Sequence, residues 1–457
     1  MTFWRRKNEI LKKINDQWFS VNRSLGEYDK RGMKMSYGTK GLKGEVTVPG
    51  DKSISHRSIM LGAIAEGETV VHGFLESADC ISTVNCFKAM GVDISLKGTE
   101  VRIQGAGLYG LKKPEGVLDT GNSGTTTRIM TGLLAGQDFD VTVNGDESIR
   151  KRPMGRVIDP LTLMGAHIES ENGNGCAPLR IYGSKLKGIS YVMPVASAQV
   201  KSAILLAGLY ADGETVVMEK AASRNHTELM LKGFGADVRT DGLSCRVIPG
   251  RMLKGTELTV PGDISSAAYF MGAALIVPGS EVVIKNVGIN PTRDGIIRVF
   301  KEMGADMELL NRHFEAGEEV ADIKVRYSEL KGTTIGGSII PALIDELPLI
   351  AVVATQAAGT TVIKDAAEMK VKESDRIKLM CDGLKAMGAD ITPTEDGMII
   401  NGLSSLHGAE IEDEKDHRIA MSFTVASLIA DKAVSLKTPN CVKISYPGFY
   451  EDLKKLM

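Results

Sequence analysis

The 457-residue sequence contains no hydrophobic run that approaches the roughly 20 residues needed for a membrane-spanning helix. It also lacks an excess of charge of either sign, because 55 Lys and Arg stand against 57 Asp and Glu, which gives a net charge of −2. A broad basic surface for a nucleic-acid backbone is therefore not indicated. We expect a cytoplasmic protein that binds neither nucleic acid nor a membrane.

Cysteine is scarce and scattered. The six cysteines form no C-x-x-C pair and the chain has seven histidines, so neither a disulfide framework nor a metal site is expected, and we predict buried thiols. The phosphate-binding motif G-x-x-x-x-G-K-[ST] is missing, as is a dinucleotide motif G-x-G-x-x-G at the start of a helix. We therefore expect no ATP, NAD or other cofactor.

The first 35 residues differ from the rest of the chain. They are basic, hold both tryptophans, Trp4 and Trp18, and lack the apolar core of a secretory signal. We interpret residues 1–35 as a non-catalytic N-terminal extension, a helix that packs loosely or not at all. The alternative is a partner-binding helix.

A repeat dominates the remainder. The segment LKGEVTVPGD (42–51) recurs as LKGTELTVPGD (253–263), which indicates two related halves. Within the halves, a small-residue helix followed by a β-branched strand occurs at residues 63–73, 133–145, 209–219, 275–286, 355–365 and 427–437. Five of these units continue into a second helix that closes on a Gly-Ala-Asp-like C-cap and another strand, and the sixth ends in a predicted helix over 449–456.

This periodicity predicts an α/β protein of two domains, each made of three units around a common helical core. One domain spans residues 51–261, and the other combines residues 36–50 with 262–457. The crossings at 49–51 and 261–263 contain Pro and Gly, which suit a hinge.

Cations stand where the helices start and in the loops after the strands. An N-cap explains one polar residue per helix, but it does not explain Lys or Arg in the first turn, where the helix dipole disfavours cations. Helix N-termini bind anions readily, so these cations predict anionic ligands. The set is Lys52, Arg57, Arg128, Arg152, Arg224, Lys372, Arg376 and Arg418.

So many cations exceed the needs of one phosphate. We infer two phosphorylated or carboxylated substrates that meet between two hinged domains. Asp345 and Glu373 lie among the cations, where carboxylates serve either as ion-pair partners or as general acid and base.

Seven motifs in order resemble one family from about residue 38 onward: PGDKSISHR, LDTGNSGTTTR, RKRP, SAQVKSA, PALIDELP, VKESDR and DHRIAMSF. The family is 5-enolpyruvylshikimate-3-phosphate (EPSP) synthase, also called 3-phosphoshikimate 1-carboxyvinyltransferase. The resemblance implies a two-domain inverse αβ barrel of six βαβαββ-type units, the enolpyruvyl transferase fold. It also implies transfer of the enolpyruvyl group of phosphoenolpyruvate to the 5-hydroxyl of shikimate 3-phosphate, with release of phosphate, in the shikimate pathway of aromatic amino acid biosynthesis.

The resemblance also assigns roles by matching motif. The residues implied to bind shikimate 3-phosphate are Lys52, Ser53, Arg57, Ser197, Ala198, Gln199, Arg224, Asp345 and Lys372. Those implied to bind phosphoenolpyruvate are Lys52, Gly124, Arg152, Gln199, Arg376 and Arg418. Asp345 is assigned to remove the hydroxyl proton and Glu373 to protonate C3, and Lys52 is a third candidate for proton transfer.

The sequence departs from the better-known branch of the family near its end. A Lys that contacts phosphoenolpyruvate there falls on Ile444, while Lys443 is one position off and would face the other way in a strand.

A second departure concerns glyphosate, an inhibitor of the family. Ile129 replaces the usual Pro, and Ala198 with Lys201 resembles the second class of these enzymes, whose members are often insensitive to glyphosate. We therefore expect weak inhibition, although Gly124 argues mildly the other way because the inhibitor fits beside Gly there.

Two alternatives remain. UDP-N-acetylglucosamine enolpyruvyl transferase shares fold and donor, but its reactive Cys has no counterpart beside an Arg-Pro pair in this sequence. A non-catalytic anion-binding protein of the same fold would gain nothing from Asp345 and Glu373 beside its ligand. For the EPSP synthase interpretation we expect a monomer whose partners are its two small-molecule substrates.

Overall fold

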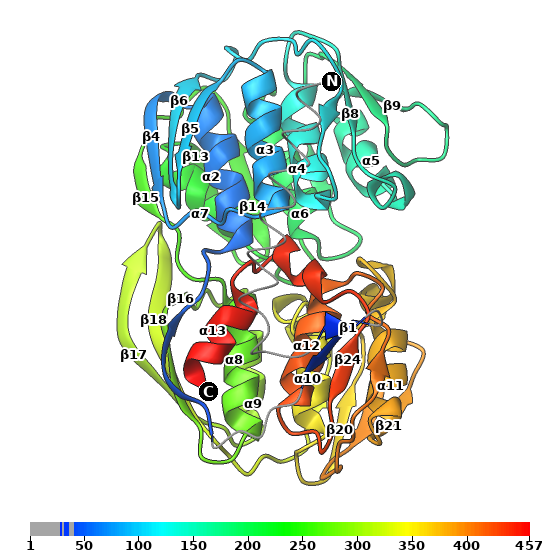
Figure 1. Ribbon diagram of the computed structural model, residues 1–457. Coiled ribbons are helices and arrows are strands. Elements are labelled where there is room, and N and C mark those ends of the chain that lie inside the picture. Colours follow the sequence, from blue (N-terminus) through cyan, green and yellow to red (C-terminus); the bar gives the residue numbers. More distant parts are fainter. Residues whose placement is uncertain (1–27, 30–31, 36–40) are drawn as a thin grey trace, which may run out of the picture.

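The structure is a computed structural model that describes residues 28–29, 32–35 and 41–457. Its strands form six four-stranded sheets, and each sheet contains one parallel and two antiparallel pairings. The sheets and helices gather into two lobes, one above the other in Figure 1. We call the elements from α2 to β15 the N lobe, and β3 together with the elements from α8 onward the C lobe.

Six units of the same design make up the lobes. In each unit a first helix leads to a strand at an inner position of a sheet. The first helices are α2 (Lys52–Ile64), α4 (Gly124–Ala135), α6 (Ala198–Gly208), α8 (Ile264–Ile276), α10 (Leu347–Ala354) and α12 (His417–Ser427). The strands that follow them are β4 (Glu66–His72), β8 (Val141–Asn144), β12 (Thr215–Met218), β16 (Glu281–Gly288), β20 (Thr360–Ile363) and β24 (Val434–Leu436).

The second helices lie where the Gly-Ala-Asp-like endings predict them. They are α3 (Ala78–Ala89), α5 (Gly155–Leu163), α7 (His226–Gly233), α9 (Gly295–Glu302), α11 (Arg376–Ala386) and α13 (Phe449–Leu456). The first five lead into hairpins that complete the sheets. These are β5 (Asp93–Lys97) with β6 (Glu100–Ala106), β9 (His167–Ser170) with β10 (Leu179–Tyr182), β13 (Asp237–Asp241) with β14 (Ser244–Ile248), β17 (Asp306–Glu315) with β18 (Glu318–Arg326), and β21 (Asp390–Pro393) with β22 (Met398–Asn401).

One further strand lies parallel to the inner strand of each sheet. These strands are β15 (Glu257–Thr259), β7 (Leu118–Asp119), β11 (Ser190–Val192), β3 (Lys43–Thr47), β19 (Thr334–Ile335) and β23 (Glu410–Ile411). Short 3-10 helices are η2 (Ile149–Lys151), η3 (Gly337–Ala342), η4 (Ala367–Val371) and η5 (Pro439–Ile444). The order of elements confirms the predicted α/β class with six repeated units.

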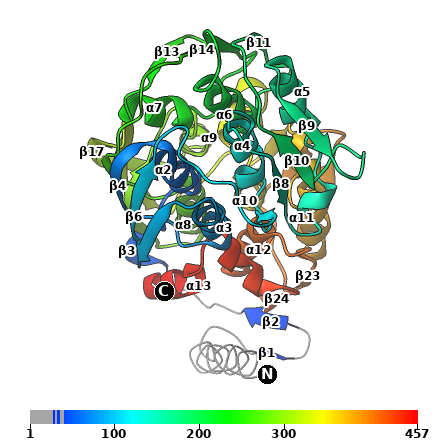
Figure 2. The same cartoon turned by 90° about the horizontal axis from the view of Figure 1, so that it is seen from above.

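The expectation for residues 1–35 needs a correction where the structure describes them. Instead of a loosely packed helix, Tyr28–Asp29 (β1) and Gly32–Met35 (β2) form strands, and β2 pairs antiparallel with β24 (Figure 2). They occupy the place in their sheet that a hairpin fills in each of the other five sheets. The predictions for residues 1–27, including both tryptophans, lie outside the described residues.

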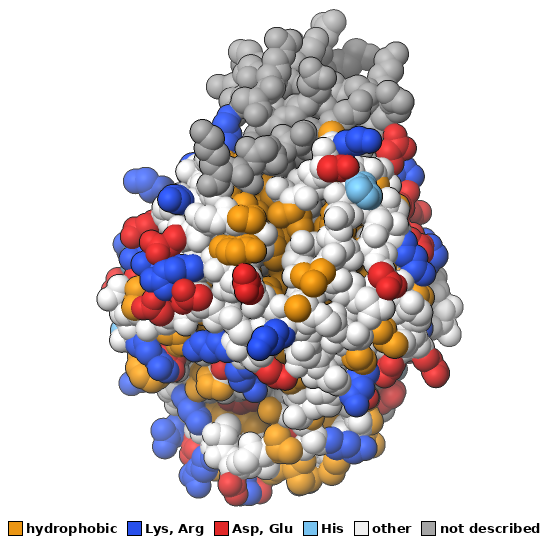
Figure 3. Space-filling view, turned by 90° about the horizontal axis from the view of Figure 1, so that it is seen from below, with side chains coloured by type: hydrophobic (Ala, Val, Ile, Leu, Met, Phe, Trp, Pro, Cys, Tyr) orange, Lys and Arg blue, Asp and Glu red, His pale blue; other side chains and the backbone are white. Residues whose placement is uncertain are grey.

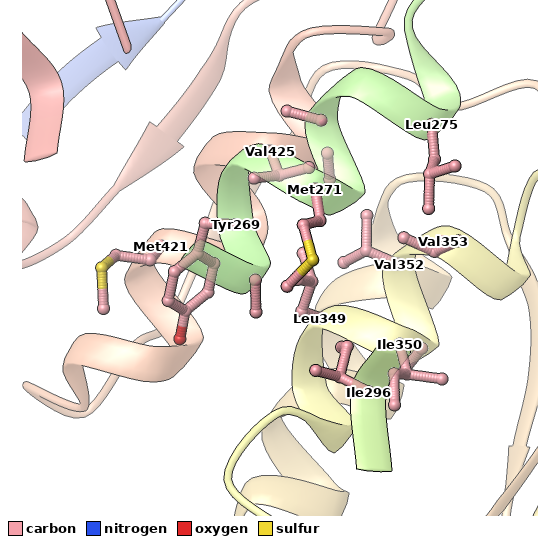
Figure 4. Packing of buried hydrophobic residues seen from close by; sticks show 14 of the residues in the cluster. Tyr269, Met271, Leu275, Ile296, Leu349, Ile350, Val352, Val353, Met421 and Val425 are labelled. Atoms are coloured by element: carbon pink, nitrogen blue, oxygen red, sulfur yellow. The ribbon is translucent and has the colours of Figure 1, made fainter. Parts of the chain in front are cut away.

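The inner helices of the C lobe are buried against one another, since α8 and α10 are apolar on nearly every face and α12 is mostly apolar or small beyond His417 and Arg418. All residues of α8, α10 and α12 are buried, and the side chains of Met271, Leu349 and Val425 pack between them (Figure 4). In the N lobe, α4 crosses α6 so closely that a Cβ on Gly132 would lie 2.0 Å from the carbonyl oxygen of Ala203. Glycine is therefore required at that contact.

Two separate hydrophobic cores result. One contains residues from Ile54 to Val260, and the other contains Leu42, Val46 and Val48 together with residues from Ile264 to Leu456. All six cysteines are buried free thiols, as predicted. No helix in residues 41–457 or in the described part before them could cross a membrane. Seen from below, the surface carries charges of both signs around small hydrophobic patches (Figure 3).

The two crossings between the lobes lie against each other. Gly50 and Gly262 form an antiparallel bridge, with the Asp51 amide donating to the Pro261 carbonyl at 2.8 Å and the Asp263 amide to Pro49 at 2.9 Å. Side chains also join the lobes away from the crossings. These pairs are Arg156 with Glu368 at 2.9 Å, Asn225 with Asn290 at 2.8 Å and His226 with Glu318 at 3.5 Å.

Candidate active site

The first helices start with side-chain caps. Five of the six have an Asp or Ser whose side-chain oxygen accepts a hydrogen bond from a backbone amide of the first turn, and α10 begins after Glu346 without such a bond. The predicted cations contact four carboxylates, those of Asp79, Asp345, Glu373 and Asp416, and the contacts bring the helix starts of both lobes into one site.

Asp345 lies at the centre of this site. Its carboxylate is 2.5 Å from Arg224 of the N lobe, 3.3 Å from Arg376, and 3.8 Å from both Lys372 and Arg418. Burial alone would raise the pKa of Asp345, but the surrounding cations, led by Arg418, hold it well below the usual range. Asp345 is therefore ionised at neutral pH.

Arg376 is held by three carboxylates. Its Nε donates to Asp416 Oδ2 at 2.8 Å, its Nη1 donates to Asp345 Oδ1 at 3.3 Å, and its Nη2 contacts Glu373. Asp416 uses its other oxygen to accept from the amide of Arg418 at 2.9 Å, so one carboxylate both caps α12 and orients Arg376. Burial would raise the pKa of Glu373, yet Arg376 and other nearby cations keep it well below its usual range.

Lys52 and Lys372 differ in their surroundings. Lys52 Nζ lies 3.0 Å from Asp79, and although burial lowers its pKa, the charges of Asp79 and Glu373 raise it to a net upward shift. The pKa of Lys372 is lowered, chiefly by burial, with Asp345 opposing the shift. Lys52 is thus a firmly charged group, and Lys372 is the easier of the two lysines to deprotonate.

A second group of cations surrounds Gly124 at the start of α4. A Cβ on Gly124 would lie 3.0 Å from Arg128 Nη1 and 3.2 Å from Arg152 Nη1. Arg128 donates to Gln199 Oε1 at 2.9 Å, while Gln199 Nε2 donates to Thr125 at 3.0 Å. Gln199 therefore links α6 to α4, and the glycine leaves room for the two guanidinium groups.

Arg57 is buried in the N lobe. Its Nε donates to Thr227 at 2.6 Å, its Nη2 to Ser202 at 2.8 Å and its Nη1 to the Ser53 carbonyl at 3.0 Å. Ser197 caps α6 and Ala198 is its first residue. The predicted residues of α2, α4, α6 and the 372–376 segment are thus joined through neighbouring contacts into one site.

Sequence reasoning missed three members of this site. Asp79 reads as an ordinary acidic residue in the first turn of a helix, and Asp416 reads as a plain N-cap, because their partners are distant in sequence. His417 is buried with no hydrogen-bond partner on either ring nitrogen, and burial lowers its pKa to about 4. For these residues the sequence offered one signal, namely a polar side chain at a helix start, which for Asp416 and His417 lies close to the predicted cation Arg418.

The expectation for the C-terminal contact also needs a correction. Lys443 and Ile444 belong to the 3-10 helix η5, not to a strand, so strand alternation does not decide which way Lys443 faces. Ile444 lines a groove of about 460 Å³ with Lys415 and Lys437 among its walls.

The described residues contain no group of three or more His, Cys, Asp or Glu that could hold a metal ion. Comparison with known proteins then places the chain. The family model described as EPSP synthase (3-phosphoshikimate 1-carboxyvinyltransferase) matches residues 36–453. The chain belongs to the EPSP synthase family. Strands β1 and β2 precede the matched residues.

Individual relatives agree with this assignment. The 3-phosphoshikimate 1-carboxyvinyltransferase of Thermoanaerobacter sp. (strain X514) is 59% identical over 415 residues, which cover 91% of this chain and 98% of the relative. That of Brevibacillus brevis is 54% identical over 417 residues, with 91% and 98% covered. The predicted family and transferase activity are confirmed.

Solved structures show the same fold. The EPSP synthase of Acinetobacter baumannii has a TM-score of 0.85 and 49% identity, and the match covers 93% of this chain and 97% of that one. The enolpyruvyl transferase NikO of Streptomyces tendae has a TM-score of 0.76 at 15% identity, covering 93% and 96%, which is a likeness of fold alone. The predicted enolpyruvyl transferase fold is therefore confirmed.

Proposed function

We propose that this protein transfers the enolpyruvyl group of phosphoenolpyruvate to the 5-hydroxyl of shikimate 3-phosphate at the site centred on Asp345. The observation that carries the proposal is an ionised carboxylate that contacts cations from both lobes. An ionised carboxylate suits a general base, and the cations around it suit two substrates that bear phosphate and carboxylate groups.

The cations divide between the two substrates. Shikimate 3-phosphate binds against α2, α6 and the Arg224 loop, with the residues Lys52, Ser53, Arg57, Ser197, Ala198, Gln199, Arg224, Asp345 and Lys372. Phosphoenolpyruvate binds between α4 and the start of α12, with the residues Lys52, Gly124, Arg152, Gln199, Arg376 and Arg418. The division is supported by geometry, since Gln199 bonds to Arg128 beside Gly124 and is adjacent to Ala198 in α6.

The first half of the reaction is an addition. Asp345 takes the proton of the 5-hydroxyl group while the hydroxyl oxygen forms a bond to C2 of phosphoenolpyruvate. The electrons of the C2–C3 double bond take a proton from Glu373 at C3. The product is a tetrahedral phospho-ketal. In the second half Glu373 takes a proton back from C3, the double bond re-forms, and the C2–O bond to phosphate breaks with both electrons on the phosphate, which takes the proton held by Asp345. Fixed cations stabilise the charge that moves onto the phosphate.

Glu373 requires a substrate-dependent change to act as an acid. Its pKa is low chiefly because Arg376 is close, with Arg152 and Lys52 adding to the effect, so it is ionised before the substrates bind. Bound phosphate and carboxylate groups neutralise these cations and thereby raise its pKa. Lys52 keeps its proton through the pairing with Asp79 and is the alternative donor.

Domain closure fits the arrangement of the crossings. We propose that residues 51–261 form one domain, that 36–50 and 262–457 form the other, and that 49–51 and 261–263 are the hinge. The paired backbone at Gly50 and Gly262 gives a short axis about which the lobes can rotate. We further propose a cytoplasmic monomer that needs neither nucleic acid nor a cofactor.

The test is phosphate release from phosphoenolpyruvate with two acceptors in parallel. Release that depends on shikimate 3-phosphate and collapses in Glu373→Gln supports both the reaction and the acid. Release with UDP-N-acetylglucosamine instead would favour the second enolpyruvyl transferase. A folded protein with no release in either sample would point to anion binding alone. Asp382→Asn, which removes a carboxylate from an exposed ion pair on α11, is the matched control.

A further inference from the structure

The loop that joins β12 to α7 carries Arg224 to the centre of the site. Residues 224–226 are consecutive, and each contacts the C lobe through its side chain. The position of this short segment therefore sets both the Arg224–Asp345 contact and the approach of the lobes. To hold this position, the loop must also be fixed by contacts within the N lobe, which we call its anchor.

Lys201 of α6 supplies the anchor. Its Nζ lies 2.7 Å from Glu219 at the end of β12, 2.7 Å from Glu228 in the first turn of α7, and 3.4 Å from the carbonyl of Ser223 in the loop. The three charged side chains are only 3–6% exposed. The Lys201 ammonium thus contacts Glu219 and Glu228 at the two ends of the loop and the carbonyl of Ser223, the residue before Arg224.

The anchor is separate from the packing that holds the two helices together. Ser202 bonds to Thr227 at 2.7 Å, and both also hold Arg57, so α6 and α7 remain joined without Lys201. A buried ion cluster stabilises a fold less than apolar side chains of the same volume would, because its members lose their hydration. Its distinctive contribution is fixed geometry at the loop.

We propose that Lys201 is a positioning residue for the acceptor substrate, acting through Glu219 and Glu228 on the loop that presents Arg224. The inference rests on the proposed binding of shikimate 3-phosphate by Arg224. Lys201 does not contact the substrate in this scheme. It sets the place of a residue that does.

Lys201→Met keeps the length of the side chain and removes its charge. We expect the KM for shikimate 3-phosphate to rise at least fivefold, while the KM for phosphoenolpyruvate stays within twofold. Lys232→Met on α7, whose lysine contacts exposed Thr240, is the matched control and should leave both constants unchanged. Equal changes in both KM values, or a loss of stability alone, would overturn the proposal.

Glu219→Gln is a milder variant that leaves Lys201 paired with Glu228 and releases one end of the loop. It should fold and raise the KM for shikimate 3-phosphate in the same direction. The triple variant Lys201→Met, Glu219→Gln, Glu228→Gln has no unpaired charge, so its thermal stability should exceed that of Lys201→Met while its KM stays high. Recovery of the KM in the triple variant would assign the effect to unpaired charge and refute positioning.

Arg224→Ala distinguishes the proposed binding role of Arg224 from the positioning role of Lys201. In an Arg224→Ala background, Lys201→Met should add no further change to the KM for shikimate 3-phosphate, because the residue it positions is gone. An unchanged KM in Arg224→Ala alone would refute the proposed binding role. A raised KM in Arg224→Ala with an unchanged KM in Lys201→Met would refute the positioning role only.

Discussion

Replacing Asp345 by Asn tests the centre of the proposed mechanism. The change preserves side-chain shape but removes a negative charge that lies within 4 Å of Arg224, Arg376, Lys372 and Arg418. An amide is also unable to accept the proton of the 5-hydroxyl. General base catalysis contributes about 10²–10⁴ in rate, so kcat should fall by that factor, which corresponds to about 3–5 kcal/mol of activation free energy.

Substrate binding should respond in the opposite direction. The carboxylate competes with the phosphoenolpyruvate anion for Arg376 and Arg418, so its removal should leave the KM for phosphoenolpyruvate equal or lower. Without substrate, the unpaired cations repel one another, and the variant should unfold more easily in phosphate-free buffer. Removing one partner from a buried ion pair costs about 3–5 kcal/mol, which is an upper bound here because the Asp345 side chain is 13% exposed.

The assay is the initial rate of phosphate release at saturating concentrations of both substrates, together with a thermal melt with and without shikimate 3-phosphate. Asp382→Asn removes a carboxylate from an exposed i,i+4 pair and should change stability by no more than about 0.5 kcal/mol. A folded Asp345→Asn enzyme whose kcat lies within tenfold of the wild-type value would remove Asp345 from proton transfer.

Three further predictions concern other parts of the site. Gly124→Ala should raise the KM for phosphoenolpyruvate several-fold, because the new Cβ would lie 3.0 Å from Arg128 and 3.2 Å from Arg152, and an unchanged KM in steady-state kinetics would contradict this. The pKa values of buried His56 and His417 are lowered from 6.5 to about 3 and about 4, chiefly by burial, so the unfolded chain takes up protons first as the pH falls. The free energy of unfolding should therefore be highest above pH 6.5 and fall toward pH 4 by up to about 1.4 kcal/mol per pH unit for each histidine. Urea titrations at several pH values give the change in the free energy of unfolding per pH unit. This pH dependence should be smaller in His56→Asn than in the wild type, by the equivalent of one proton, and equal pH dependences would refute the assignment. Inhibition by glyphosate should be weak, and inhibition in the low micromolar range at moderate phosphoenolpyruvate would disprove it.

The six units could be predicted because their signals are local. A β-branched strand after a small-residue helix, and a glycine that closes the second helix, depend on residues within one turn of each other. The predicted helix over 449–456 coincides with α13 for this reason. The strands at 28–29 and 32–35 were missed because they are only two and four residues long, too short for a periodic pattern, and because β2 pairs with β24, which is about 400 residues away in the sequence.

The site residues likewise divide into those that the sequence could predict and those that it could not. Cations at helix starts could be recognised individually because they contradict the helix dipole. Two of their carboxylate partners could not, since Asp79 and Asp416 sit at positions where any helix favours an acidic residue. The pairing of Lys201 with Glu219 and Glu228 also remained hidden, because it forms only when α6, β12 and α7 meet in the folded lobe.

Burial divides the carboxylates of the site by role. The side chain of Asp416 is fully buried against Arg376, so a substrate anion cannot replace it, and it serves as a permanent partner that orients the guanidinium. Glu373, by contrast, is 30% exposed and Asp345 is 13% exposed, and both share their cations with the space where substrates bind. In the proposed mechanism, substrate anions compete with these two carboxylates and leave Asp416 in place. As each anion takes over a cation, the neighbouring carboxylate loses the charge that kept its pKa low and gains affinity for a proton. We therefore expect these ion pairs to delay proton transfer until both substrates are bound.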